Sequence, residues 1–152
     1  MLSVPKEELY QYIDISLNSS SWILIDQDKI NSFADVTLDH QFIHIDEKAA
    51  AQSPFGGTIA HGYLTMSLIP YFMAECSVVP NNAVMGINYG SDKVRFLQPV
   101  LVNSEIRGRA TLKAVVEKAP GQLLIKNEFV IEIKGEEKPA LIAEILSMYI
   151  VQ

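Results

Sequence analysis

The sequence is poor in cysteine and in basic residues. Its 152 residues include one cysteine, Cys76, which cannot form an intrachain disulfide and which stands among apolar neighbours, as a small buried residue would. We therefore expect a reducing, cytoplasmic location. Lysine and arginine total 12 against 18 aspartates and glutamates, for a formal net charge of -6. Nucleic acid is not expected as a partner, because binding the phosphate backbone needs clustered basic residues.

Secretory and membrane-spanning segments are not expected either. The N-terminal MLSVPKEELYQ has neither the basic start nor the apolar run of a signal peptide. The longest nearly uncharged run, residues 56–74, is interrupted by His61 and Pro70 and makes a poor membrane span. We expect a protein without a membrane segment, and its length suits one domain covering residues 1–152.

The N-terminal half shows capping and turn signals. Pro5 is placed to open a short helix to about residue 13, and the apolar run 22–25 predicts a strand. Asp26 then predicts the N-cap of a helix that turns Ile30 and Phe33 inward. Asp46 predicts a second cap, for a short helix over about 47–52.

A change of period divides the chain. From about His61 to Cys76 apolar residues occupy nearly every side, which predicts one helix buried in the middle of the fold. From Val84 onward the residues alternate instead, with turn signals between the segments, which predicts about four long antiparallel strands in a meander. The order indicates an α+β fold, an antiparallel sheet wrapped around the apolar helix.

Two of the predicted strands show their faces clearly, on either side of the hairpin turn Pro120-Gly121. The inward face of the first is predicted to hold Ile106, Gly108, Ala110, Leu112, Ala114 and Val116. Its outward face carries Arg107, Arg109, Thr111, Lys113 and Glu117. The second strand turns Ile125, Phe129, Ile131 and Ile133 inward.

One short stretch, FADVTLDHQFIHID at residues 33–46, concentrates groups that move protons or bind metals: Asp39, His40, His44 and Asp46. A metal site is one interpretation, since His40 and His44 have the spacing of two ligands on one helical face. The context argues against it, because Gln41 stands where a zinc protease needs a glutamate and the stretch is poor in helix formers.

A purely structural role is a second interpretation, in which Asp39 and Asp46 terminate helices and the histidines are surface or core groups. It leaves two features unexplained. The Gly56-Gly57 pair lets the backbone turn sharply or approach a ligand closely, and His61-Gly62 begins the buried helix.

An acid/base site is the third interpretation and the one we favour. Asp39 and His44, on a non-helical loop, would converge on one water that His44 is suited to deprotonate. The N-H groups at the start of the buried helix, left open by Gly62, would hold a carbonyl oxygen that becomes negative. Phe42 and Ile43 would wall the pocket. For His61 beside this helix start, we favour a structural role over a catalytic one.

The stretches TLDHQFIHID and PFGGTIAHGYLTMSLIP together resemble the hydratase signature of the MaoC-like dehydratases, the (R)-specific enoyl-CoA hydratases of hot-dog fold. Asp39 and His44 fall on the signature aspartate and histidine, and residues 59–62 (Ile59-Ala60-His61-Gly62) fall on its second element. VRFLQPV, residues 94–100, resembles the family's strand ending in Pro-Val. The resemblance runs from about residue 26 to the C-terminus.

The resemblance implies a hot-dog sheet around the helix, a homodimer with sites near the subunit interface, and reversible syn addition of water to a trans-2-enoyl thioester. In that family the aspartate and histidine bind the reacting water and a backbone N-H at the His-Gly helix start holds the thioester oxygen. The resemblance therefore implies that Asp39 and His44 are the catalytic pair of this sequence and that Gly62 is the oxyanion donor. The substrate is carried on CoA or an acyl carrier protein, and no cofactor or metal is expected.

This sequence departs from the signature in ways that resemble the nodulation-protein-N-like branch. Leu38 replaces the signature glycine, and Gln41-Phe42 replaces Asn-Pro, which leaves the partner of the Gln41 amide and the acyl preference open. Lys93 and Arg95 are candidates for the CoA phosphates, with solvated strand residues as the alternative. Two other functions stay open: a binding protein without turnover, and a thioesterase, for which Glu75 offers a carboxylate at the far end of the helix.

Overall fold

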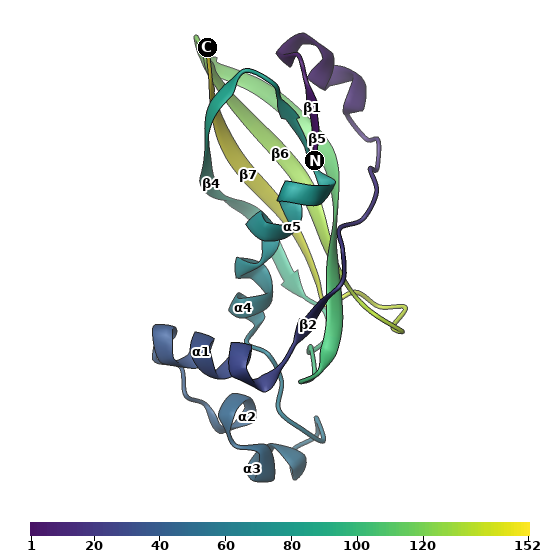
Figure 1. The fold of residues 1–152 in the computed structure, drawn as a ribbon, viewed down its shortest axis with the longest axis vertical. Helices are drawn as coiled ribbons and strands as arrows, with labels where there is room; N and C mark the ends of the chain where they lie inside the picture. The colour runs from purple at the N-terminus through teal and green to yellow at the C-terminus, as the bar shows by residue number, and fades with distance from the viewer.

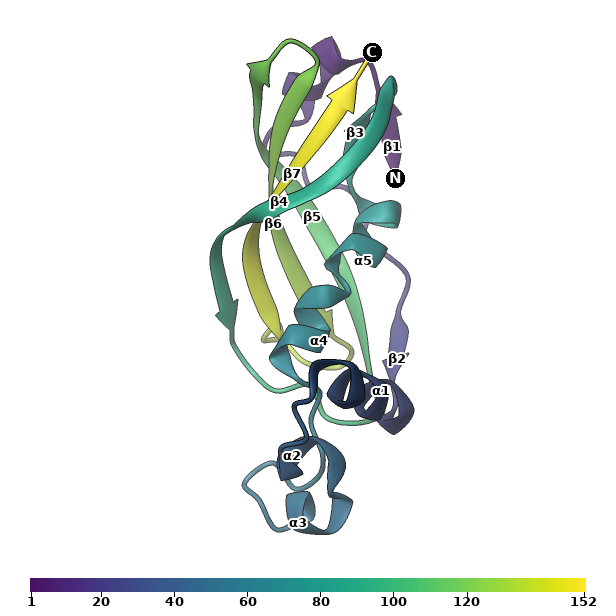
Figure 2. The same cartoon turned by 90° about the vertical axis from the view of Figure 1, so that its left-hand side faces the viewer.

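The computed structural model describes residues 1–152 and is built on a curled, antiparallel five-stranded sheet with the strand order β2-β5-β6-β7-β4. Its strands are β2 (Ile23–Ile25), β4 (Ala83–Phe96), β5 (Ser104–Ala119), β6 (Gln122–Ile133) and β7 (Leu141–Val151). Figures 1 and 2 show the sheet curling around the helices α4 (Gly62–Ser67) and α5 (Ile69–Cys76). The predicted α+β fold, with a sheet wrapped around a helical axis, is confirmed.

The remaining elements lie at the two ends of this core. At one end, β1 (Leu2–Val4) pairs in parallel with β3 (Val78–Pro80), beside the 3-10 helix η1 (Lys6–Tyr12). At the other, α1 (Gln27–Thr37), α2 (Phe42–Ile45) and α3 (Glu47–Ala51) form a lobe below the sheet in Figure 1. None of these helices has the length and apolarity needed to cross a bilayer.

Local capping positions the helical lobe as the sequence predicts. The Asp26 carboxylate accepts a hydrogen bond from the Lys29 N-H at 3.0 Å, and the Asp46 carboxylate accepts one from the Ala49 N-H at 2.9 Å. Each cap satisfies an N-H that the first turn of a helix leaves unpaired. The two caps therefore fix where α1 and α3 begin, and with them the loop that carries Asp39.

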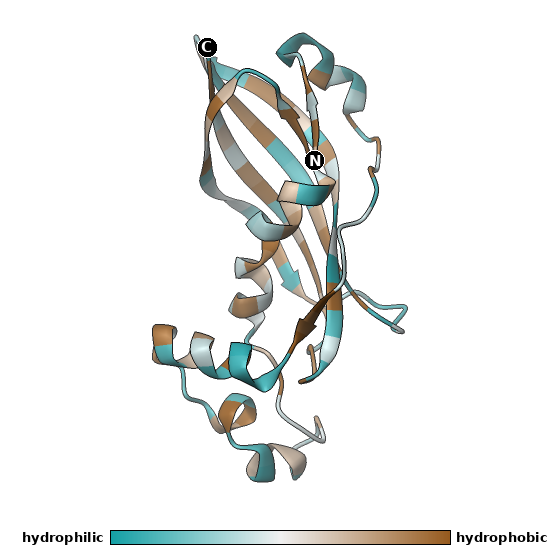
Figure 3. Ribbon diagram, viewed as in Figure 1, coloured by the Kyte–Doolittle hydropathy of each residue, from teal (hydrophilic) through white to brown (hydrophobic).

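Close packing of α5 against the sheet fixes the helical axis. A Cβ at Gly108 of β5 would lie 2.6 Å from Cβ of Phe72 and 2.6 Å from Cζ of Phe129, far inside van der Waals contact. Only glycine lets the helix come this near to the strands. The predicted inward residues of β6, namely Ile125, Phe129, Ile131 and Ile133, are all buried. Figure 3 shows the apolar residues alternating along these strands.

The predicted single buried helix is divided and covered on one side only. It breaks at Leu68 into α4 and α5, where Pro70, near the start of α5, has no N-H to donate to the preceding turn. Tyr63 and Tyr71 are 69% and 53% exposed, so the side of the axis away from the sheet is open in the single chain. Tyrosine suits such a position because its hydroxyl can face water while the ring packs.

The predicted four-strand meander is correct for β5, β6 and β7 but wrong for β4. That strand pairs with β7 at the far edge, although β5 follows it in sequence. Residues 97–103 carry the chain across to the opposite side, with Ile59 bridging Leu101 on the way. The end of β4 and this crossing segment are thereby brought to the start of α4.

The predicted inward face of β5 is wrong beyond Leu112, because a β-bulge exchanges the two faces of the strand there. The register against β6 shifts between Leu112 and Ala114, so that Val115 is buried and Val116 is 47% exposed. A single extra residue exchanges the two faces of a strand. The alternation of the sequence holds on both sides of the bulge, but no local signal marks the bulge itself.

Candidate active site

A pocket of about 430 Å³ opens where the helical lobe meets the start of α4 and the end of β4. Its apolar walls include Phe55, Phe96 and Pro99, and its polar groups include His44 and the backbone of Gly62. The full lining is His44, Phe55, Ile59, Ala60, Gly62, Thr65, Phe96, Leu97, Gln98, Pro99, Val100 and Ala140. The pocket is therefore mainly apolar, with one histidine and one helix start among its lining groups, as in sites for small organic ligands.

His44 has a buried ring whose surroundings favour its neutral form. It lies in α2, so the expectation that it stands on a non-helical loop is wrong, because residues 42–45 form one short helical turn. Its buried ring donates from Nδ1 to the Ile59 carbonyl at 2.7 Å, leaving Nε2 as the proton acceptor. Burial lowers the pKa of His44, and repulsion from His61 acts in the same direction, against the opposing effects of the Ile59 hydrogen bond and the Asp39 charge.

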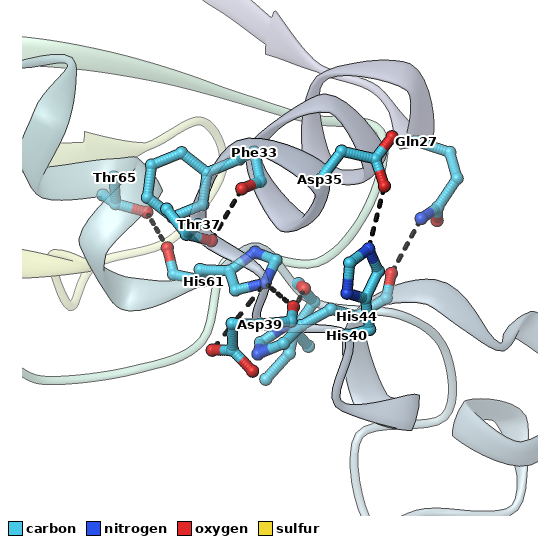
Figure 4. Close-up of polar contacts among 10 residues, drawn as sticks. Gln27, Phe33, Asp35, Thr37, Asp39, His40, His44, His61 and Thr65 are labelled. Carbon is cyan, nitrogen blue, oxygen red and sulfur yellow. Dashed lines mark hydrogen bonds and ion pairs between the residues drawn. The ribbon is translucent and has the colours of Figure 1, made fainter.

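Asp39 lies beside His44, on the loop between α1 and α2. Its carboxylate is 55% exposed, with Oδ2 at 3.9 Å from Nε2 of His61. One side-chain ligand atom from each of Asp39, His44 and His61 lies within 4.8 Å of the others. Figure 4 shows the three gathered together, with His40 to one side. The fold thus brings Asp39 and His44 close enough to act on one small molecule between them.

His61 underlies this pair without lining the pocket. Its Nε2 donates to the Asp39 carbonyl at 2.9 Å, and its ring stacks on the His44 ring with 3.7 Å between centroids. Phe33 packs against its other side at 5.1 Å. The side chain is 3% exposed, and Nδ1 is buried without a hydrogen-bond partner.

The geometry of the histidines does not fit a shared metal ion. His40 is bonded to Asp35 at 2.8 Å, away from the site, so the His40–His44 pair of the metal interpretation is not formed. The rings of His44 and His61 lie face to face, 23° from parallel. An ion bound to a histidine lies in the ring plane, about 2.0–2.1 Å from the nitrogen, and one ion cannot meet that condition for two stacked rings.

Gly62 places a backbone donor in the lining of the same pocket. It is the first residue of α4, so its N-H has no partner within the helix, and His61 at the N-cap provides no side-chain cap. The Phe96 ring covers it closely, because a Cβ at Gly62 would lie 3.0 Å from that ring. An N-H in this apolar setting can stabilise a developing oxyanion.

The other site residues predicted from the sequence lie at varying distances from this pocket. Ile59 lines it, whereas Gln41, Phe42 and Gly57 do not; Phe42 is half-exposed, and the aromatic walls are Phe55 and Phe96. The Gln41 side chain makes no hydrogen bond to Asp39 or His44, and only the Gln41 carbonyl accepts one, from the His44 N-H.

The two basic candidates stand on β4, just before Phe96. Lys93 donates to Glu144 at 2.7 Å, whereas Arg95 donates to the adjacent Val94 carbonyl and makes no ion pair. Of the two, Arg95 therefore has the charge that is free to meet an anionic ligand.

Gln27 and Thr58 support the site, and neither was predicted from the sequence. The Gln27 amide donates to the His44 carbonyl at 2.7 Å and accepts from the Thr58 hydroxyl at 2.6 Å. This bridge ties α1, α2 and the segment before Ile59 together. No local pattern signals it, since its members are 17 and 31 residues apart in the chain.

A curled antiparallel sheet wrapped around one side of a helical axis is the hot-dog fold, and the site just described lies at the start of that axis. The sequence matches the family model described as "MaoC like domain" over residues 8–129. The chain therefore belongs to the MaoC-like domain family, and the resemblance seen in its motifs is confirmed.

Two named proteins are similar to this chain over most of its length. Nodulation protein N of Rhizobium leguminosarum bv. viciae is 46% identical over 128 residues, covering 84% of this chain and 80% of that protein. The 3-hydroxyacyl-thioester dehydratase Z of Mycobacterium tuberculosis is 40% identical over 134 residues, covering 88% of each.

Two solved structures show the same fold. The MaoC-like dehydratase from Rhodospirillum rubrum superposes with a TM-score of 0.78 at 18% identity, covering 98% of both chains. The (R)-hydratase from A. caviae involved in PHA biosynthesis superposes with a TM-score of 0.69 at 20% identity, covering 87% of this chain and 94% of that one. At these identities the likeness establishes the fold alone.

Proposed function

We propose that this protein is an (R)-specific enoyl-CoA hydratase, which adds water reversibly and syn to a trans-2-enoyl thioester. The observation that carries the proposal is the arrangement at one pocket, which His44 and Gly62 both line, with the N-H of Gly62 at the helix start. Asp39 is not a lining residue, but its carboxylate lies within 4.8 Å of a ring nitrogen of His44. Its relatives include a 3-hydroxyacyl-thioester dehydratase, and dehydration is the reverse of the proposed reaction.

The chemistry uses only these groups. His44, kept neutral by burial, accepts a proton at Nε2 from a water oriented by Asp39, and the water oxygen forms a bond to C3 of the enoyl group. The C2–C3 π electrons move toward the thioester oxygen, where the Gly62 N-H stabilises the enolate charge. The proton held by the Asp39–His44 pair then passes to C2 from the same face, giving the (R)-3-hydroxyacyl thioester. No cofactor enters any step.

We further propose CoA as the carrier, with Arg95 close to its phosphates. Arg95 lies next to Phe96 of the pocket wall and makes no ion pair, whereas Lys93 is paired with Glu144. Arg95→Ala is expected to raise KM for an enoyl-CoA about 3- to 10-fold, the equivalent of one charge-assisted contact, with little change in kcat. A short thioester lacking the nucleotide should show no such change, and Lys93→Ala is the matched control. An equal rise in KM for both substrates would contradict phosphate binding.

A homodimer with sites near the interface is also proposed. Strand β4 pairs with β7 on one side only, is mostly exposed over its length, and presents Val84, Met85, Ile87 and Tyr89. A long apolar edge strand is a template for pairing with another chain. Tyr63 and Tyr71, on the helical axis, are exposed as well. Sedimentation equilibrium should give twice the monomer mass, and a monomer at micromolar concentration would contradict the proposal. A cytoplasmic location remains our expectation from the sequence.

Product analysis separates this function from its alternatives. Purified protein mixed with short and medium trans-2-enoyl-CoA should give 3-hydroxyacyl-CoA as the product. Free CoA thiol would indicate a thioesterase, for which the structure offers little: Glu75 accepts a hydrogen bond from the Ser21 N-H at 2.7 Å and does not line the pocket. Stabilisation by the thioester without any product would indicate a binding protein.

A further inference from the structure

His61 contacts both members of the proposed catalytic pair by different parts of one ring. Its Nε2-H holds the Asp39 carbonyl at 2.9 Å, and its face lies against His44 with the ring planes 23° apart. Its backbone occupies the N-cap position of α4, directly before Gly62, without a hydrogen bond from the side chain. One buried side chain thus connects the two residues to whose side chains the proposed reaction assigns a role.

His61 is itself shielded from the pocket. It is not among the lining residues, and Phe33 and the Thr65 hydroxyl, which donates to its carbonyl at 3.4 Å, enclose it. Any effect it has on a substrate must therefore pass through Asp39 or His44.

We propose that His61 is a positioning residue that sets Asp39 against His44. The inference rests on the proposed hydratase function. The Asp39 carboxylate is exposed and makes no hydrogen bond that would fix it, so its place depends on the backbone that His61 holds. Stacking fixes the second member, because the His44 ring can tilt only by leaving the His61 face.

Two substitutions separate the two contacts. His61→Phe keeps a ring against His44 but cannot donate to the Asp39 carbonyl, and His61→Gln keeps a donor but loses the ring face. Each is expected to lower kcat about 10- to 100-fold with KM changed less than about threefold, as misplacement of a reacting group does. A urea unfolding curve of each variant identifies any loss that comes from misfolding. Folded variants with unchanged kcat would overturn the proposal.

A double-mutant cycle distinguishes positioning from general support of the fold. In an Asp39→Ala background, assayed at raised enzyme concentration, His61→Phe should change kcat by less than about twofold, because the group it positions is gone. An undiminished effect in that background would show that His61 acts on the fold and not through Asp39.

The pH profile gives an independent readout. The charged or titratable groups acting on His44 are His61 and Asp39; Gln27 of α1 and the Ile59 segment present neutral groups. Replacing His61 removes a contribution that lowers the pKa of His44, so the acid limb of kcat/KM should move to higher pH in both variants. An acid limb of kcat/KM at the same pH in wild type and variants would contradict an electrostatic contact between His61 and His44.

Histidine NMR decides the inference even if the protein hydrates no thioester. In wild type, ¹⁵N-labelled rings should show His61 as the Nε2-H tautomer and His44 as the Nδ1-H tautomer, and the titration midpoint of His44 should rise in His61→Phe. Absence of turnover in wild type would remove the proposed function. An unchanged midpoint or the opposite tautomers would remove the role of His61.

Discussion

The oxyanion role of Gly62 can be tested by deleting a single N-H group. Proline has no N-H and is well tolerated at the first position of a helix, which is where Gly62 stands. The preceding residue, His61, already has ψ 137, within the range that a following proline requires. Gly62→Pro should therefore remove the donor while α4 still forms.

The matched control is Gly62→Ala, which keeps the N-H and adds only the Cβ. That Cβ would lie 3.0 Å from the Phe96 ring, so the ring must shift by a few tenths of an ångström, and we expect kcat to fall less than about fivefold. Loss of an oxyanion donor costs about 2.7–4 kcal/mol, so Gly62→Pro should lower kcat about 10²- to 10³-fold relative to Gly62→Ala.

The assay is steady-state hydration of an enoyl-CoA by both variants, with circular dichroism and urea unfolding to verify the fold. Folded Gly62→Pro protein that turns over as fast as Gly62→Ala would refute the oxyanion role of Gly62. The oxygen would then be held by some other group.

Three other predictions follow from packing, strain and charge. Gly108→Ala should lower the free energy of unfolding by about 1–3 kcal/mol or more in urea, because its Cβ meets Phe72 and Phe129, while Gly57→Ala, which meets nothing within 4 Å, should change it by less than about 0.5 kcal/mol. Leu38→Gly should raise the free energy of unfolding by up to about 1 kcal/mol, since Leu38 is held at φ 62 and is 81% exposed; a loss of stability would contradict strain at this cap. Because burial lowers the pKa of His44, kcat/KM should keep its plateau as pH falls through 6.5 and decline only below it; a limb at or above 6.5 would contradict a buried neutral base.

The sequence predicted best what neighbouring residues decide. The caps Asp26 and Asp46 each depend on an N-H only three residues away, and they were predicted correctly. The inward face of β6 depends on strict alternation along one strand, and it was predicted correctly too. Asp39 and His44 were picked out because they lie close together in the chain, and Gly62 because it begins an apolar run.

Features set by distant parts of the chain were beyond the same reasoning. The pairing of β4 with β7 depends on where residues 97–103 cross the molecule, and the bulge after Leu112 depends on the partner strand. The Gln27–Thr58 bridge joins segments whose separation gives no periodic signal. His61 was interpreted as structural from its position at a helix start, and its contacts with Asp39 and His44 emerged only from the fold.

The most direct test of the proposed function is the initial rate at which trans-2-enoyl-CoA absorbance is lost with wild type, Asp39→Asn and His44→Gln. Each substitution keeps the size of the side chain and removes its acid or base. Wild type should consume the substrate, and each variant should be slower by about 10²- to 10⁴-fold, the contribution of a positioned general acid or base. No turnover by wild type at any chain length, or full activity in both variants, would contradict the account.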